Sequence, residues 1–216
     1  MPDSSAAPSL RTRVRRMAEL ADYDATTLYA IIDAAYLCHI AFHDAGGAHC
    51  IPTACWRDGG HLYIHGSNGS RLLKRLTEAD SCVAITHLDG LVLARSAFNH
   101  AMNYRSAMIY GRFEKVAGAA AKQAALAALM DKLAPGRQAE VRAGSAKEMA
   151  ATSVLRIALD EAAAKVRSGA PRDDADDMAL PVWAGVLPFA QRRTAPLADA
   201  GAGALAPGYV RDWCQE

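Results

Sequence analysis

The chain has 216 residues, of which 51% are hydrophobic and 22% are charged, and its formal net charge is +1. This composition is that of an ordinary globular protein, and it provides no global basic field for binding nucleic acid. No apolar run approaches the roughly 20 residues that a membrane span needs, and the polar, then basic N-terminus does not resemble a secretory signal. We therefore expect a cytoplasmic protein that binds neither nucleic acid nor membranes.

The cysteines and histidines are not spaced as metal ligands. The five cysteines include no CxxC pair, and we interpret them as small buried hydrophobic residues in a reducing compartment. His39 and His43, like His61 and His65, are four residues apart within expected strands, which separates the members of each pair by about 13 Å. That distance is too long for a shared zinc ion, so no metal site is predicted.

The first half of the chain has the pattern of short strands separated by turn residues. Pro52 lies inside one of these strands, where proline removes a donor from the ladder, so we expect an edge, a bulge or a ligand-facing kink there. Asp58-Gly59-Gly60 predicts a hairpin turn. The expected elements are a helix capped by Asp24, strands at 36–43, 49–57 and 61–66, and a helix from Ser70 to about Ala79.

The second half adds longer elements. Asp89-Gly90 predicts a hairpin turn between two strands, and the segment 152–167 is interpreted as one long strand. Because sequential short strands with hairpin turns close most easily into a barrel, the predicted fold class is α+β, mainly antiparallel, with six to eight strands. The other expected elements are a strand at 104–116, an alanine-rich helix closed by Pro135-Gly136, a short helix from Ser145 and a polar loop at 168–180. We expect one domain at 15–190, a flexible tail at 1–14 and an extension at 191–216.

Hydrogen-bond donors gather where the third strand is followed by a helix. A helix N-terminus offers unpaired N–H groups and a favourable dipole to an anion, and glycines allow the backbone to approach it. Arg71 can offer a planar fork to two phosphate oxygens, and Lys74 lies one turn later. The pattern predicts a phosphate site; a capped surface helix with solvated basic residues is the alternative, and the missing GK[ST] ending argues against nucleotide triphosphate hydrolysis. The residues of this strand–helix corner are Gly66, Ser67, Gly69, Ser70, Arg71 and Lys74.

Several other polar and aromatic residues are ambiguous by themselves. His65 ends the third strand, where it either contacts a ligand or is a partly exposed strand-end histidine. Trp183 either packs in the core or an interface, or covers a planar ligand, whereas core packing is favoured for Trp56. One polar run opens a later strand and indicates only that its start is exposed or hydrogen-bonded: Asn103, Tyr104, Arg105 and Ser106.

Three segments in fixed order carry a family resemblance: IPTACWRDGGHLYIHGSNGSRLLKRL, NYRSAMIYGRFEKV and SGAPRDDADDMALPVWAGVLP. Together they resemble the pyridoxamine 5′-phosphate oxidase-related flavin-binding family, and within it the branch that includes the nitroimidazole-resistance proteins. The similarity runs from about Arg15 to Val186. The resemblance implies a split β-barrel that forms a homodimer, with two FMN molecules in clefts at the subunit interface.

The resemblance also implies roles for individual residues. It places Pro52, Thr53 and Ala54 beside the isoalloxazine ring. It places His65, Gly66 and Ser67 at the ring edge and ribityl chain, and Ser70, Arg71 and Lys74 at the phosphate. The residues that would approach the flavin from the partner subunit are Asn103, Tyr104, Arg105, Ser106 and Trp183.

The expected function is that of an FMN-dependent oxidoreductase acting on an unidentified small molecule, with His65 as a candidate catalytic residue. The corner departs from that of the true oxidases because Leu72 follows Arg71 and the lysine comes only at 74. Residues that would hold the phosphate of pyridoxamine phosphate have no match, which argues against that substrate. The alternative is a flavin or haem binding protein without turnover, in which His65 or another histidine would ligate the iron.

Overall fold

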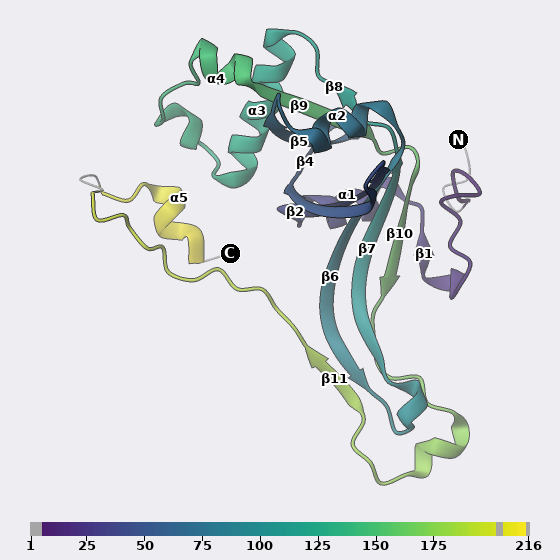
Figure 1. The fold of residues 1–216 in the computed structure, drawn as a ribbon. Coiled ribbons are helices and arrows are strands. Elements are labelled where there is room, and N and C mark those ends of the chain that lie inside the picture. The colour runs from purple at the N-terminus through teal and green to yellow at the C-terminus, as the bar shows by residue number, and fades with distance from the viewer. Residues whose placement is uncertain (1–5, 202–204, 215–216) are drawn as a thin grey trace.

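The computed structural model describes residues 6–201 and 205–214, which form a mainly antiparallel α+β fold of the split β-barrel type (Figure 1). The large sheet has the order β1 (Ala21–Asp22), β10 (Ala162–Arg167), β7 (Ala101–Gly111), β6 (Ser81–Leu93), β2 (Leu37–Asp44) and β3 (Gly47–Ala54), and β11 (Gly185–Pro188) pairs with the distal half of β6. The small sheet has the order β4 (Trp56–Asp58), β5 (His61–Ser67), β9 (Thr152–Ala158) and β8 (Glu114–Lys115). The predicted fold class is confirmed.

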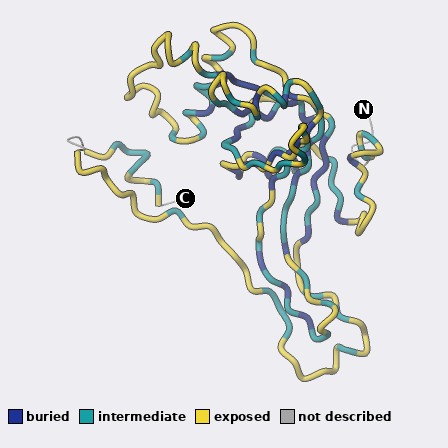
Figure 2. Tube along the Cα trace, in the orientation of Figure 1, coloured by how far each residue is buried: buried dark blue, intermediate teal, exposed yellow. Residues whose placement is uncertain are grey.

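Helices cover parts of both sheets and leave the long β6–β7 hairpin projecting as an arm (Figure 1). None of the helices in the described part of the chain has the length and apolar character of a membrane span. The surfaces of the helices around α4 and of the C-terminal extension are largely exposed, whereas the buried residues concentrate where the sheets meet (Figure 2). The helices are α1 (Ala25–Asp33), α2 (Arg71–Glu78), α3 (Ala119–Leu133), α4 (Ala146–Ala151) and α5 (Gly208–Arg211).

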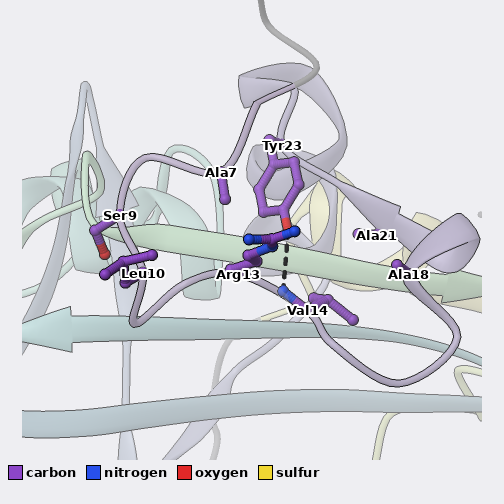
Figure 3. A pocket seen from close by; sticks show the side chains of 8 residues that line it. All are labelled: Ala7, Ser9, Leu10, Arg13, Val14, Ala18, Ala21 and Tyr23. Atoms are coloured by element: carbon purple, nitrogen blue, oxygen red, sulfur yellow. Dashed lines mark hydrogen bonds between the residues drawn. The ribbon is translucent and has the colours of Figure 1, made fainter.

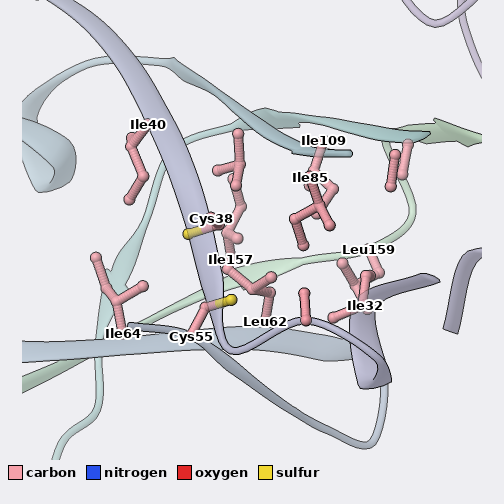
Figure 4. Close-up of a cluster of buried hydrophobic side chains, with 14 of the residues drawn as sticks. Ile32, Cys38, Ile40, Cys55, Leu62, Ile64, Ile85, Ile109, Ile157 and Leu159 are labelled. Carbon is pink, nitrogen blue, oxygen red and sulfur yellow. The ribbon is translucent and has the colours of Figure 1, made fainter. Parts of the chain in front are cut away.

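The main core lies between the two sheets and receives residues from α1 and α2 (Figure 4). Ile32, Ile40 and Leu62 are completely buried there. Because side chains alternate along a strand, the opposite face of the small sheet needs its own cover, and α3 supplies it. Trp56 and Tyr63 pack in this second cluster, with Trp56 fully buried, which confirms core packing for this tryptophan.

The cysteine prediction is confirmed only in part. Cys38 and Cys55 are buried in the main core, where Figure 4 shows their sulfur atoms. Cys50 and Cys214 are exposed, and Cys82 is partly buried. All five thiols are free within the described part of the chain.

The predicted hairpin turn at Asp89-Gly90 is wrong. β6 continues through both residues, and only a β-bulge between Leu88 and Gly90 interrupts its pairing with β7. Glycine is required because a Cβ at position 90 would lie 2.9 Å from the carbonyl oxygen of Leu187 in β11. The dipeptide is therefore a bulge and a strand-packing site, and a short 3₁₀ helix at Ala97–Asn99 lies in the connection to β7.

Three predicted strands are each divided into two. The segment 152–167 forms β9 and β10, the segment 49–57 is interrupted at Cys55 between β3 and β4, and the segment 104–116 is interrupted after Gly111 between β7 and β8. In each case the chain passes from one sheet to the other. The alternation of polar and apolar residues along a strand cannot reveal where the chain leaves one sheet for the other, because both sheets bury alternate residues.

The remaining predicted elements are found close to their expected positions. Ser70 caps α2 through its side chain, and Ser145 and Glu148 form a complete capping box at α4. Pro52 lies in the edge strand β3, which confirms the edge alternative. The predicted domain boundaries stay a prediction; within the expected tail, Thr12 is buried and Arg11 forms an ion pair with Asp80.

We predict that Gly90→Ala separates β11 from β6, because the added Cβ meets backbone atoms of Leu187 and Pro188 that cannot move independently. The expected cost is about 1–3 kcal/mol of unfolding free energy, with faster hydrogen exchange at the β11 amides. Gly144→Ala is the matched control, since its Cβ would meet only the flexible side chain of Met149. Unchanged exchange in β11 of Gly90→Ala would contradict the packing argument.

Candidate functional site

The strand–helix corner is held in place by the apolar side of α2. Ser70 Oγ accepts a hydrogen bond from the Leu73 amide at 3.4 Å, and Leu73 and Leu76 are buried in the main core. Gly66 allows this packing, because a Cβ there would lie 3.1 Å from Leu73 Cδ1. Since its apolar side faces the core, α2 presents its basic side chains to solvent.

Asn68 fastens the corner to the junction between α4 and β9. Its amide N–H donates to Ala151 O at 2.9 Å, its side-chain amide donates to Ala150 O, and the Ser153 hydroxyl donates to Asn68 Oδ1. The sequence analysis missed this residue. The available signal was an asparagine inside a Gly/Ser turn, a position at which side-chain bonds to the backbone are common.

Several donors at the corner have no partner among the described residues. The amides of Arg71 and Leu72 have no acceptor there, as expected for the first turn of a helix. The Arg71 side chain is 71% exposed, and its Nε lies 3.8 Å from Asp44 Oδ2. The Lys74 ammonium group has no partner in the described part of the chain. Among the described residues, the corner therefore combines N–H groups that lack acceptors with two positively charged side chains that are weakly paired or unpaired.

Asp44 is an acidic neighbour of the corner that the sequence analysis also missed. It accepts hydrogen bonds from His49 Nε2 at 2.9 Å and from the Gly46 amide at 2.8 Å. The hydrogen bond from His49 lowers the pKa of the Asp44 carboxyl, and the Gly46 amide adds to this. The carboxylate is thus charged and already satisfied, so it restrains Arg71 only weakly.

His65 lies on the face of β5 that α3 covers, opposite to Gly66. Its ring centroid is 5.8 Å from that of Trp56, and its Nδ1 is buried without a hydrogen-bond partner among the described residues. Burial lowers the pKa of His65. The imidazole is therefore neutral at pH 7, the form that accepts hydrogen bonds or ligates metals.

The polar run that opens β7 is engaged within the β6–β7 arm. Arg105 forms a bidentate pair with Asp89 at 2.9 Å for both hydrogen bonds. Asn103 is buried, donating to Gly169 O at 3.1 Å and accepting from Arg167. β7 carries Arg105 about 20 Å away from Gly111, and no interaction of the described residues links this run to the strand–helix corner.

Trp183 is 63% exposed, and its indole covers Gly185, where a Cβ would lie 2.8 Å from the ring. Core packing within one chain is therefore wrong for Trp183, and an interface or ligand contact remains. Other large apolar side chains are exposed on the arm and on the segments that flank β11, which is typical of an interaction surface. They are Leu88, Phe98, Met102, Met178, Leu180, Leu187 and Phe189.

A cavity of about 540 Å³ lies apart from these residues, along the N-terminal segment (Figure 3). There the Val14 amide donates to the Tyr23 hydroxyl at 3.0 Å, and Arg13 lies beside the ring. None of the predicted site residues lines this cavity. No group of three or more metal-ligating side chains is found in residues 6–201 and 205–214.

The two antiparallel sheets and the strand–helix corner are those of a split β-barrel protein, and the comparisons identify the family. The profile of the pyridoxamine 5′-phosphate oxidase family matches residues 24–166, so the chain belongs to this family. The chain is similar to the flavocytochrome Anf3 from Azotobacter vinelandii, with 41% identity and a TM-score of 0.92 over 96% of this chain and 98% of that chain.

Two further solved structures are similar. The FAD and haem binding protein from Mycobacterium smegmatis has 38% identity and a TM-score of 0.85, covering 90% of this chain and 97% of that chain. A proposed 5-nitroimidazole antibiotic resistance protein from Bacteroides thetaiotaomicron VPI-5482 has 20% identity and a TM-score of 0.57, covering 68% and 86%, which supports the fold alone. A search of the curated proteins returned no significant match.

We predict that His65 makes the protein sensitive to mild acid. Because burial lowers its folded pKa below the unfolded value of about 6.5, its stabilising contribution is present above that pH and is lost as the pH falls through the folded pKa. His65→Gln should flatten the decrease in unfolding free energy between about pH 7.5 and 5.5, measured by urea titration. The control is His39→Gln, at an exposed position on β2. A slope equal to wild type in His65→Gln would contradict the prediction.

Proposed function

We propose that the protein is a flavin-dependent redox protein that holds the flavin phosphate at the strand–helix corner and also binds haem. The observation that carries the proposal is the set of donors at this corner that have no partner among the described residues, on a helix end held in place by packing and by Asn68. The similarity to a flavocytochrome over 96% of the chain supports it, as does the similarity to a FAD and haem binding protein.

The corner suits a phosphate in charge and in geometry. Arg71 and Lys74 offset the negative charge, the amides of Arg71 and Leu72 add donors, and the dipole of α2 favours an anion at this end. The hydroxyls of Ser67 and Ser70 each accept a bond from the backbone and keep a proton to donate. FMN and FAD share the phosphate next to the ribityl chain, so the corner accepts either, and FMN stays the prediction from the sequence.

A bound flavin supplies hydride and single-electron transfer, and the chain supplies position and electrostatics. In this proposal Pro52, Thr53 and Ala54 in the edge strand β3 lie beside the isoalloxazine ring. The Arg105–Asp89 pair orients a guanidinium that would contribute positive charge near the ring. Asp89 balances the charge of Arg105, so the main effect of the ion pair is to hold the Arg105 side chain in one orientation.

The proposed site needs a second copy of the chain. Within one chain, the run from Asn103 to Ser106 lies on the arm and has no interaction with the corner. The exposed apolar side chains of the arm and of the segments that flank β11, including Trp183 and Phe189, provide a surface for a homodimer. In the dimer, the arm of one subunit would bring this run and Trp183 to the corner of the other.

In this proposal, His65 is the residue that would ligate the haem iron. Its imidazole is neutral, and neither Nδ1 nor Nε2 has a hydrogen-bond partner in the described residues. The Trp56 ring packs against the imidazole, with the two ring centroids 5.8 Å apart. The role of His65 as a catalytic residue at the flavin is the alternative.

The proposal predicts the composition of the purified protein. A native mass spectrum should show a dimer with one flavin and one haem for each chain, and the cofactor mass separates FMN from FAD. The absorbance spectrum should combine flavin bands with a Soret band, and His65→Ala should lose the Soret band while it keeps the flavin.

Three results would contradict parts of this proposal. A colourless protein that takes up neither FMN nor FAD would overturn the flavin site. A flavin spectrum that shows no Soret band after haem is added would remove the haem. A Soret band that persists unchanged in His65→Ala would assign the iron to another residue.

A further inference from the structure

We propose a second ligand site, for a planar aromatic carboxylate, between the C-terminal end of α3 and the C-terminal extension. The cavity there has a volume of about 500 Å³, within the range of small-molecule sites. None of its lining residues belongs to the strand–helix corner or to the arm. It is therefore independent of the proposed flavin site.

The walls of this cavity are mainly aromatic and aliphatic. Three aromatic side chains contribute to the lining, Tyr36 after α1 and Tyr209 and Trp213 of the extension, together with Leu133 and Pro135 at the end of α3. A lining with three aromatic side chains suits a flat ring, because offset stacking and edge contacts add to the burial of apolar area. The lining is therefore our reason for proposing that the ligand contains a flat aromatic ring.

Lys132 provides the anion-binding group. Its ammonium donates to Ile32 O at 3.3 Å and to Asp33 O at 3.2 Å, which are carbonyl groups at the C-terminal end of α1. An ammonium group has three donors, so one remains after these two bonds. The group also lies 5.6 Å from the Tyr36 ring centroid. A positive charge is thus held in one place beside the aromatic walls, with a donor to spare.

No carboxylate of the described residues neutralises Lys132. The nearby Asp33 carboxylate is committed to Arg57 through two hydrogen bonds, at 2.6 and 2.9 Å. Burial lowers the pKa of Lys132, which reflects the cost of keeping this charge away from water. A carboxylate from a ligand would compensate the charge and use the remaining donor.

Polar contacts hold the C-terminal extension against the segment that follows α3. The Tyr209 hydroxyl donates to Glu140 at 2.7 Å and accepts from Arg137 at 3.2 Å. Arg193 stacks on Trp213 with its guanidinium carbon 4.2 Å from the ring centroid, and both residues line the cavity.

Isothermal titration calorimetry of the purified full-length protein tests this site. The probe is 2-naphthoate, and 2-naphthylmethanol is the uncharged analogue of the same shape. We expect one naphthoate for each chain, bound roughly tenfold or more tightly than the alcohol, as a charge-assisted hydrogen bond implies. Lys132→Gln should remove this difference, and the matched control Lys147→Gln, at an exposed position on α4, should keep it.

Two outcomes would overturn the site. One is the absence of naphthoate binding to the wild-type protein, and the other is unchanged naphthoate affinity in Lys132→Gln. If Lys132→Gln does not fold, Trp213→Ala replaces it, since Trp213 lies on the extension outside both sheets; this variant must bind both probes more weakly, and unchanged binding refutes the site. The flavin absorbance recorded on the same samples shows independently whether the proposed flavin site is intact.

Discussion

The rest of the proposed site depends on the way in which β5 is joined to α2. The apolar side of α2 is buried through Leu73 and Leu76, and Gly66 makes room for this packing. Asn68 then ties the turn to Ala150 and Ala151, on a segment more than 80 residues away in the sequence. Because the helix end is fixed from two sides, its free N–H groups point to one place without a ligand to order them. An anion that binds there has little ordering entropy to overcome.

The same arrangement explains why the basic residues are poorly paired in a single chain. Arg71 has only the distant Asp44, which His49 and Gly46 already satisfy, and Lys74 has no partner among the described residues. A protein surface can leave such charges to water at almost no cost. What distinguishes the corner from an ordinary capped surface helix is the combination of these charges with an anchored backbone.

The sequence predicted the parts of the fold that depend on local chemistry. Ser70 and Ser145 were identified as helix starts because a cap acts within one turn. An edge was one of three alternatives for Pro52, beside a bulge and a ligand-facing kink, because proline lacks a donor. The strand breaks at Cys55 and Gly111 were not predicted, because they occur where the chain changes sheets and depend on partners distant in sequence. Asp89-Gly90 misled for the same reason: β11, about 100 residues later, decides that this glycine packs in a bulge.

The candidate site could be predicted from sequence only where its residues are close together. Ser70, Arg71 and Lys74 share one helix end and were found as a group. Asn68 was missed since its partners lie on α4 and β9, and Asp44 because its proximity to Arg71 arises from tertiary packing. The role of Trp183 was ambiguous because its indole is exposed in one chain, so that only a second copy of the chain or a ligand could cover it.

The central claim is that the corner binds the flavin through its phosphate. Its most direct test compares FMN with riboflavin, which lacks the phosphate, in titrations of the flavin-free protein and of Arg71→Ala. The account predicts that wild type binds FMN far more tightly than riboflavin, and that Arg71→Ala loses about 1.5–3 kcal/mol for FMN but almost nothing for riboflavin. The exposed Arg16→Ala should behave as wild type. Equal affinities of the wild-type protein for FMN and riboflavin would contradict the account.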